Sequence, residues 1–162
     1  MEKRDLYNEK RQLVGKAIDY LEKVPEGMYY ITVVIWIQNS NEEFLLQKTS
    51  LKKHHMWATT GGHPKSGETS LEGIVREVKE ELGLRINPEE LVLFKTIKTD
   101  DDFVDLYYLK HDFDLNLAKL QSEEVESVMW ASYNVIEDLI RSGKFLPPHI
   151  EFYKDCLKYI NK

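Results

Sequence analysis

The chain has 162 residues, of which 42% are hydrophobic and 31% are charged, and its formal net charge is −6. This size and composition predict a single soluble domain with a core of its own. An acidic chain without a long basic stripe is a poor candidate for binding duplex DNA or RNA.

The single cysteine and the N-terminal segment indicate the cellular compartment in which we expect the protein. Cys156 has no second cysteine with which to form an internal disulfide, which favours a reducing environment. The N-terminal segment is charged and lacks the apolar run of a signal peptide. The longest apolar run, at residues 31–37, is too short to cross a bilayer. We therefore expect a cytoplasmic protein that does not insert into a membrane.

The first 28 residues allow two interpretations. Several apolar residues stand at helical spacing, which favours an amphipathic helix: Leu6, Leu13, Ala17, Ile18 and Leu21. Gly15 lies in the middle of this segment, and a glycine weakens a helix by about 1 kcal/mol relative to alanine. The spacing alone does not decide between a helix and another structure.

The rest of the chain alternates between strand and helix patterns. Runs of β-branched and aromatic residues predict strands at 29–37, 44–48, 56–60, 91–99, 103–110 and 125–131. Helical patterns predict helices at 70–82, 133–142 and 150–159. We expect Gly143 to end the second helix and the pair Pro147-Pro148 to break the chain before the third. This order indicates an α+β fold with a mixed sheet and helices on both sides.

The helix at 70–82 has clear ends and a clear buried face. Thr69, followed three residues later by Glu72, forms a capping box, and Gly83 stands where a helix C-terminal glycine belongs. One apolar stripe runs along the helix: Leu71, Ile74, Val75, Val78 and Leu82.

Three glutamates share an arc of this helix beside the apolar stripe. At about 100° per residue, Glu77, Glu80 and Glu81 fall on one arc at the rim of the core. Like charges at this spacing repel one another, and a divalent cation converts that repulsion into binding. Mg²⁺ prefers hard oxygen ligands and binds phosphate oxygens alongside carboxylates. The alternative for an arbitrary trio of glutamates is a solvated helix face.

The residues around the trio follow a longer pattern. The pattern comprises Gly62, Glu68, Arg76, Glu77, Glu80, Glu81, Gly83 and Leu84. At every fixed position it resembles the signature of the Nudix hydrolase superfamily. The resemblance implies an α/β/α sandwich with a mixed sheet, formed by one domain over residues 1–162 with the signature at 62–84.

A closer resemblance rests on the front segment 6–30, the residues LLQK at 45–48 and GGHP at 61–64. Together they look similar to the Nudix hydrolases that resemble isopentenyl-diphosphate isomerase. The front segment of those proteins is a hairpin, so the resemblance favours an N-terminal hairpin extension at 1–28 over a helix, with a short helical turn near Tyr20.

Carried over to this sequence, the resemblance implies a metal site. The ligands of Mg²⁺, or of Mn²⁺ in its place, would be Glu77, Glu80, Glu81 and the backbone carbonyl of Gly61. Arg76 would orient Glu77 through a bidentate ion pair. Glu68 would support the loop that precedes the helix, on the substrate side of the site.

Two basic candidates lie outside the helix. His63 stands two residues after Gly61, the expected metal ligand, and we expect it to contact substrate or metal. Lys48 belongs to a basic group that could hold phosphate oxygens, together with Lys52, Lys53, His54 and His55. The alternatives are a hydrogen-bonded surface histidine and a solvated basic loop.

A further acid is expected from a later loop. Glu124 lies six residues before Trp130, a spacing that resembles the extra acid of some relatives. It could accept the proton of the attacking water or hold a second metal ion. Alternation places Glu126 on the same side, so the two acids are not separated by sequence. A solvated acidic turn is the alternative.

These observations predict a Mg²⁺-dependent pyrophosphohydrolase that cleaves a diphosphate linkage in a nucleoside diphosphate-X type or related small molecule. The alternative of a different class is a non-catalytic Nudix-like module that senses a nucleotide or metabolite. The isomerase is the rival enzyme, but Gly61 stands where its motif carries a cysteine. The resemblance is also compatible with a homodimer.

Overall fold

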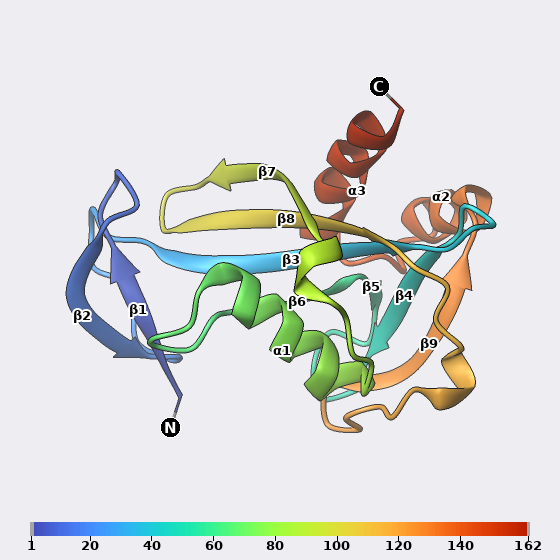
Figure 1. Ribbon diagram of the computed structural model, residues 1–162, viewed down its shortest axis with the longest axis horizontal. Coiled ribbons are helices and arrows are strands. Elements are labelled where there is room, and N and C mark those ends of the chain that lie inside the picture. The colour runs from blue at the N-terminus through green and yellow to red at the C-terminus, as the bar shows by residue number, and fades with distance from the viewer. Residues whose placement is uncertain (1, 162) are drawn as a thin grey trace.

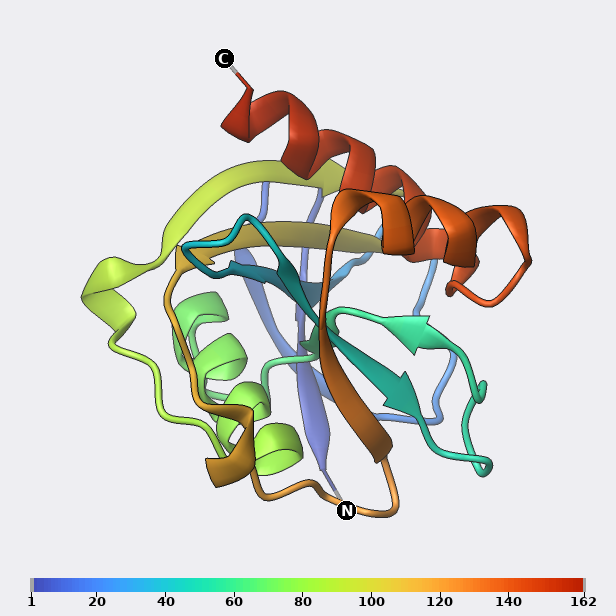
Figure 2. The same cartoon turned by 90° about the vertical axis from the view of Figure 1, so that its right-hand side faces the viewer.

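The computed structural model describes residues 2–161 (Figures 1 and 2). Its strands are β1 (Lys3–Tyr7), β2 (Leu13–Asp19), β3 (Tyr30–Gln38), β4 (Phe44–Thr49), β5 (Trp57–Ala58), β6 (Thr60–Gly62), β7 (Val92–Lys98), β8 (Asp102–Lys110) and β9 (Val125–Ala131). Its α-helices are α1 (Ser70–Leu82), α2 (Tyr133–Arg141) and α3 (Pro147–Ile160), and short 3-10 turns lie at Pro88–Glu90 and Leu115–Leu117. Within this part of the chain, no helix is long and apolar enough to span a membrane.

A mixed sheet forms the centre of the molecule. Its main path runs β5-β4-β3-β8-β7, with β6 paired to β3 and β9 paired to β4. The central pair, β3 and β8, is parallel, and the other pairings are antiparallel. Helix α1 covers one face, and α2 and α3 cover the other (Figures 1 and 2). The expected α+β sandwich with a mixed sheet is confirmed.

Strand β3 is buried on both faces, which explains its near-continuous apolar run. Its odd-numbered residues, such as Val33 and Ile35, pack in one cluster with Ile74 and Val78 of α1. Trp36 points the other way, into a cluster with the aromatic and aliphatic residues of α2 and α3. The sheet therefore separates two cores, and α1 is held against one of them by its apolar stripe.

The ends of the helices follow local chemistry, with one correction. The capping box of Thr69 and Glu72 is present, and Gly83 adopts the left-handed conformation at the end of α1, with φ of 67°. The pair Pro147-Pro148 does not break the chain as expected but forms the first turn of α3. Proline is tolerated there because the first N–H groups of a helix have no partner within the helix.

The N-terminal segment is a hairpin and not a helix. Strands β1 and β2 pair antiparallel from Lys3–Asp19 to Tyr7–Leu13. Leu6 and Ile18 are its buried apolar side chains, whereas Leu13 is exposed, so the helical spacing does not correspond to one buried face. A turn follows at Tyr20. In Figure 1 the hairpin lies across the start of β3.

A buried ion pair fastens this hairpin to the sheet. Arg11 donates to both carboxylate oxygens of Asp105, at 2.7 and 2.5 Å, and Asp105 is 0% exposed. Ser70 and Thr96 donate to the same carboxylate, at 2.5 and 2.8 Å. Burial alone would raise the pKa of Asp105, but these hydrogen bonds, that from Arg11 foremost, hold it below its ordinary value. One carboxylate therefore joins the hairpin, β7, β8 and the start of α1.

The substitution Arg11→Gln is expected to lower the free energy of unfolding by about 3 kcal/mol at neutral pH, because it leaves the Asp105 carboxylate buried without its cation. In the unsubstituted protein this stabilisation is lost as the pH falls through the lowered pKa of Asp105. The effect of the substitution should therefore shrink at acidic pH, where Asp105 becomes protonated.

Urea unfolding of both proteins across the pH range measures this dependence. Arg141→Gln is the matched control because its ion pair with Asp138 is exposed, and we expect a change below about 0.5 kcal/mol. Equal losses in the two variants would contradict the central role of the Arg11–Asp105 pair.

Candidate active site

One elongated cavity of about 810 Å³ lies beside the sheet. Its walls come from the hairpin, the starts of β3 and β8, the loop around β6, the acidic face of α1 and the first turn of α3. All three glutamates of the predicted arc line it together, namely Glu77, Glu80 and Glu81. The helix arc predicted from spacing alone therefore lies in the wall of a cavity, with Glu80 also exposed to solvent.

Two adjacent glycines let the loop approach the sheet and the helix closely. A Cβ added at Gly61 would lie 2.9 Å from the carbonyl oxygen of Val33. A Cβ added at Gly62 would lie 2.4–2.8 Å from side-chain atoms of Glu77, including a carboxylate oxygen. The missing side chains therefore give the Glu77 carboxylate its place beside the loop backbone.

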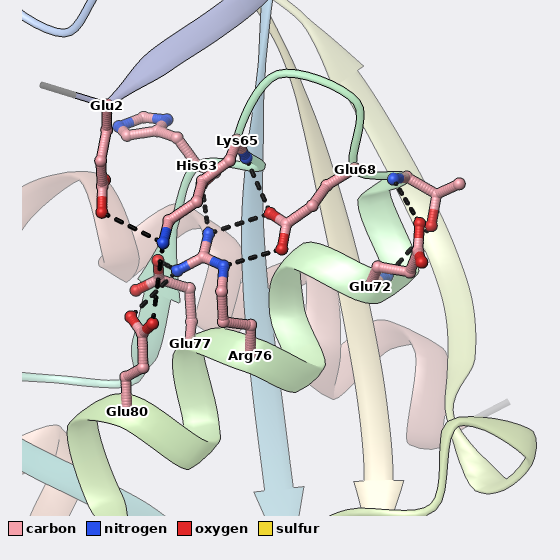
Figure 3. A network of polar contacts seen from close by, with 9 residues as sticks. Glu2, His63, Lys65, Glu68, Glu72, Arg76, Glu77 and Glu80 are labelled. Carbon is pink, nitrogen blue, oxygen red and sulfur yellow. Dashed lines mark hydrogen bonds and ion pairs between the residues drawn. The ribbon is translucent and has the colours of Figure 1, made fainter.

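Arg76 binds three carboxylates at once (Figure 3). It binds Glu68 through Nε and Nη2 at 2.8 and 3.1 Å, and it binds Glu77 and Glu80 through Nη1 at 2.7 and 3.0 Å. Its Nη2 also donates to the backbone carbonyl of His63 at 2.9 Å. One guanidinium thus holds two acids of α1 and the loop in a fixed relation.

Glu68 acts on the loop and not on the cavity. It does not line the cavity, and its carboxylate accepts from the Lys65 N–H at 2.7 Å as well as from Arg76. Burial alone would raise the pKa of Glu68, but the hydrogen bonds from Arg76 and Lys65 lower it. This position fits the expected support of the loop and gives no contact with a substrate in the cavity.

Glu81 is the most buried member of the acidic arc. It is 8% exposed and accepts a hydrogen bond from Gln47 Nε2 at 2.8 Å. Gln47 is itself oriented by the Thr60 hydroxyl, which donates to its Oε1 at 2.6 Å. Burial and the neighbouring Glu77 carboxylate together raise the pKa of Glu81 to about 9. Two carboxylates are therefore crowded at one point of the cavity wall.

The donor set fits a divalent cation. Carboxylates and a backbone carbonyl are hard oxygen ligands, and a cation would neutralise the like charges that Glu77 and Glu81 carry when both are ionised. Within residues 2–161, no three acidic, histidine or cysteine side chains already converge on a point at which they could hold a metal ion. Glu77 and Glu80 are instead turned toward Arg76.

His63 lines the cavity with its ring against Tyr20 and Tyr30, at centroid distances of 5.3 and 5.2 Å. Burial lowers its pKa, so the ring is neutral at pH 7. Its Nδ1 lies 3.2 Å from the carbonyl oxygen of Ile31. The structure places this expected residue in the site, on the side of the N-terminal hairpin.

The structure separates Glu124 from Glu126. Glu124 lines the cavity and pairs with Lys53 at 3.3 Å, whereas Glu126 lies outside it and pairs with Lys48 and His55 at 3.6 and 3.3 Å. The register of β4 and β9 shifts between Lys48 and Thr49, which leaves one extra residue in β9. This irregularity interrupts the alternation that made the two acids equivalent.

Lys48 does not reach the cavity, in contrast to the expectation. Its neighbour Gln47 points inward to Glu81, so alternation turns Lys48 to the opposite face of β4. The basic residues that do line this part of the cavity are Lys53 and His54.

Several lining residues escaped the sequence analysis: Arg4, Tyr20, Asp102, His149 and Phe152. They come from segments far apart in the sequence, and no local pattern marks them. Gln47 is different, because it belongs to the LLQK stretch of the resemblance and could have been singled out. His149 accepts from the Thr59 N–H at 3.3 Å, and burial lowers its pKa to about 4, so it is a neutral wall residue.

Comparison with known proteins gives consistent matches over most of the chain. The NUDIX domain profile matches residues 28–156. An uncharacterized Nudix hydrolase of Listeria innocua is 33% identical over 151 residues, covering 91% of this chain and 89% of the relative. A Deinococcus radiodurans crystal structure has a TM-score of 0.73 at 22% identity, covering 89% of this chain and 91% of that one. The NUDIX domain of Shewanella oneidensis NrtR, solved with ADP-ribose, has a TM-score of 0.65 at 13% identity, with coverages of 80% and 87%.

The substitution Gly62→Ala is expected to weaken Mn²⁺ binding about tenfold, because the added methyl group must displace the Glu77 carboxylate. Calorimetric titration with Mn²⁺ measures the change. Ser66→Ala is the control for a general disturbance of the loop, because its hydroxyl contacts Asp5 and not the acidic arc. Unchanged Mn²⁺ affinity in Gly62→Ala would show that Glu77 does not bind the cation.

Proposed function

This chain belongs to the Nudix hydrolase family, and from that premise we propose that it hydrolyses the diphosphate linkage of a nucleoside diphosphate-X type compound with the help of Mg²⁺. The observation that carries the proposal is the pair of crowded carboxylates, Glu77 and Glu81, in the wall of the cavity. A buried pair of acids is costly to ionise unless a cation joins them.

The residues that would hold the cation are Glu77, Glu80, Glu81 and the carbonyl of Gly61. A bound Mg²⁺ polarises phosphoryl oxygens and lowers the pKa of water, which is the chemistry that diphosphate hydrolysis needs. The Gln47–Thr60 pair fixes the orientation of the Glu81 carboxylate. Arg76 holds Glu77 and Glu80 nearby, and these two carboxylates would turn from it toward the cation.

Glu124 is the candidate acceptor for the proton of the attacking water. It lines the same cavity as the acidic arc, and its charge contributes to raising the pKa of Glu81. The Lys53 ammonium group lies 3.3 Å from the Glu124 carboxylate. This positively charged side chain can contact phosphate oxygens when substrate enters. Glu126 is directed away from the cavity and takes no part in this proposal.

The two rival functions are less well supported. A sensor that only binds a nucleotide has no need of an acidic arc with an ordered Gln47 behind it. The isomerase motif carries a cysteine where Gly61 stands, and Asp105 of β8 is buried in its ion pair with Arg11. Neither residue can act as an acid in the isomerase reaction.

Hydrolysis of compounds such as ADP-ribose is expected to require Mg²⁺ or Mn²⁺ and to stop when EDTA is added. A screen of nucleoside triphosphates, nucleotide sugars, dinucleotides and prenyl diphosphates, with products identified by mass, tests this and finds the X group. Turnover in excess EDTA would exclude the metal mechanism. Binding of nucleotides without any hydrolysis would favour the sensor.

The substitution Glu81→Gln is expected to lower kcat at least about a hundredfold, because it removes charge stabilisation from the site. The fold should remain intact, because glutamine can keep the contact with Gln47 and does not bury a charge. Steady-state kinetics and unfolding in EDTA measure the two effects. Glu90→Gln, an exposed residue away from the cavity, is the matched control. Near-normal kcat in Glu81→Gln would contradict the assignment.

The substitution Glu124→Gln is expected to lower kcat with little change in KM and to alter the acid limb of the pH profile. Glu126→Gln makes the same chemical change two residues away, outside the cavity, and should leave kcat within about twofold. If the two variants behave alike, the proton acceptor is not Glu124.

A further inference from the structure

Arg4 is a charged side chain buried in the wall of the cavity. It lies on β1, lines the cavity and is 8% exposed. Its guanidinium carbon stands 4.0 Å from the ring centroid of Tyr30 and 4.9 Å from that of Tyr20. Two aromatic rings thus hold the planar group in place, and this contact is the kind that arginine makes well.

The stacked rings do not satisfy the edges of the guanidinium. This group carries five N–H donors. The structure gives it one hydrogen bond, from Nη2 to the backbone carbonyl of Tyr20 at 3.1 Å, and its buried Nε has no partner. Within residues 2–161, no carboxylate forms an ion pair with it. A buried charge without a counter-ion is unfavourable and calls for a partner from outside the chain.

The acidic neighbours of Arg4 in the cavity wall are bound to other groups. Two acids line this end of the cavity. The oxygens of Asp102 accept from the hydroxyls of Thr32, at 2.7 Å, and Thr99, and Glu2 pairs with Lys65 at 3.3 Å. The positive charge of Arg4 therefore remains available to a ligand in the cavity.

Arg4 lines the same cavity as the acidic arc and is connected to it through His63. The His63 ring packs against both tyrosines, and the backbone carbonyl of the same residue accepts a hydrogen bond from Arg76, which binds Glu77. A single residue thus links the two regions. A ligand that extends from the acidic arc along the cavity toward the hairpin would meet Arg4.

We propose that Arg4, in contact with the rings of Tyr20 and Tyr30, forms a subsite for a phosphate group that the substrate carries beyond the phosphorus bound at the acidic arc. The planar fork of arginine matches the geometry of phosphate oxygens, and its Nη donors can bind them. As a statement about the substrate, this rests on the proposed hydrolase function. It favours nucleoside triphosphates over nucleotide sugars, whose X group is uncharged.

The first test measures phosphate binding without catalysis. Inorganic phosphate is titrated into ¹⁵N-labelled protein in the presence of EDTA, and the Nε–H signal of Arg4 is followed by NMR. The signal is assigned by its absence in Arg4→Lys. We expect it to shift with saturation, and we expect acetate at equal ionic strength to shift it less. An unmoved signal, or an equal response to acetate, would overturn the phosphate subsite.

Arg4→Gln is expected to weaken phosphate binding about tenfold, the loss typical of one charge-assisted contact. Affinity in each variant is followed through the backbone signals around His63. Lys16→Gln is the matched control, because it removes the same charge from an exposed position of the same hairpin. If the two substitutions weaken phosphate binding equally, Arg4 acts only through its charge and not through a direct contact, and the proposal is overturned.

The second test uses kinetics and separates a substrate contact from a merely structural one. ATP and ADP-glucose share their base and first two phosphates. Arg4→Gln should raise KM for ATP about tenfold with little change in kcat, and should leave KM for ADP-glucose within about twofold. Equal losses for both substrates, with a lower melting temperature, would mean that Arg4 only tethers the hairpin. If the unsubstituted protein hydrolyses neither compound nor any other diphosphate, the hydrolase proposal fails, while the titration still decides the phosphate site.

Discussion

Repulsion between carboxylates on one face of α1 is the constraint around which this site is arranged. Glu81 is almost fully buried beside Glu77, and the pair is unfavourable when both are ionised. The surroundings manage this repulsion from two sides: Arg76 draws Glu77 toward the loop, and Gln47 holds Glu81 from the sheet. Because Gly62 has no side chain, the Glu77 carboxylate has room beside the loop. The same crowding that destabilises the metal-free helix face is what gives a divalent cation its reason to bind there.

The position of that helix face depends on a second buried charge. Asp105 accepts from Arg11 of the hairpin and from Ser70 at the start of α1, so a single carboxylate fixes both elements relative to β8. Burying such a charge is favourable only when its partners are all in place. Hairpin, sheet and helix are therefore positioned together, and the acidic face of α1 reaches the cavity wall as a consequence.

The features that could be predicted from the sequence are those whose partners lie close along the chain. Thr69 and Glu72 cap α1 from three residues apart, and the acidic arc follows from helical periodicity alone. The Arg11–Asp105 pair joins residues 94 positions apart, so no local pattern could indicate it. The distinction between Glu124 and its neighbour in β9 depends on one extra residue in the pairing with β4. Strand alternation, on which the prediction relied, does not anticipate such a bulge.

The hairpin adds cavity-lining residues that lie outside the part of the chain matched by the family profile. The family profile begins at residue 28, after the hairpin, and includes every carboxylate of the acidic arc. Cleavage of a diphosphate needs the same carboxylates whatever group X is, whereas discrimination between substrates needs contacts with X itself. Arg4 and Tyr20 reach the cavity from outside the profile, on an element that Arg11 locks to the sheet. A binding group on a locked element loses little freedom when ligand arrives, so the hairpin is suited to add selectivity without altering the chemistry.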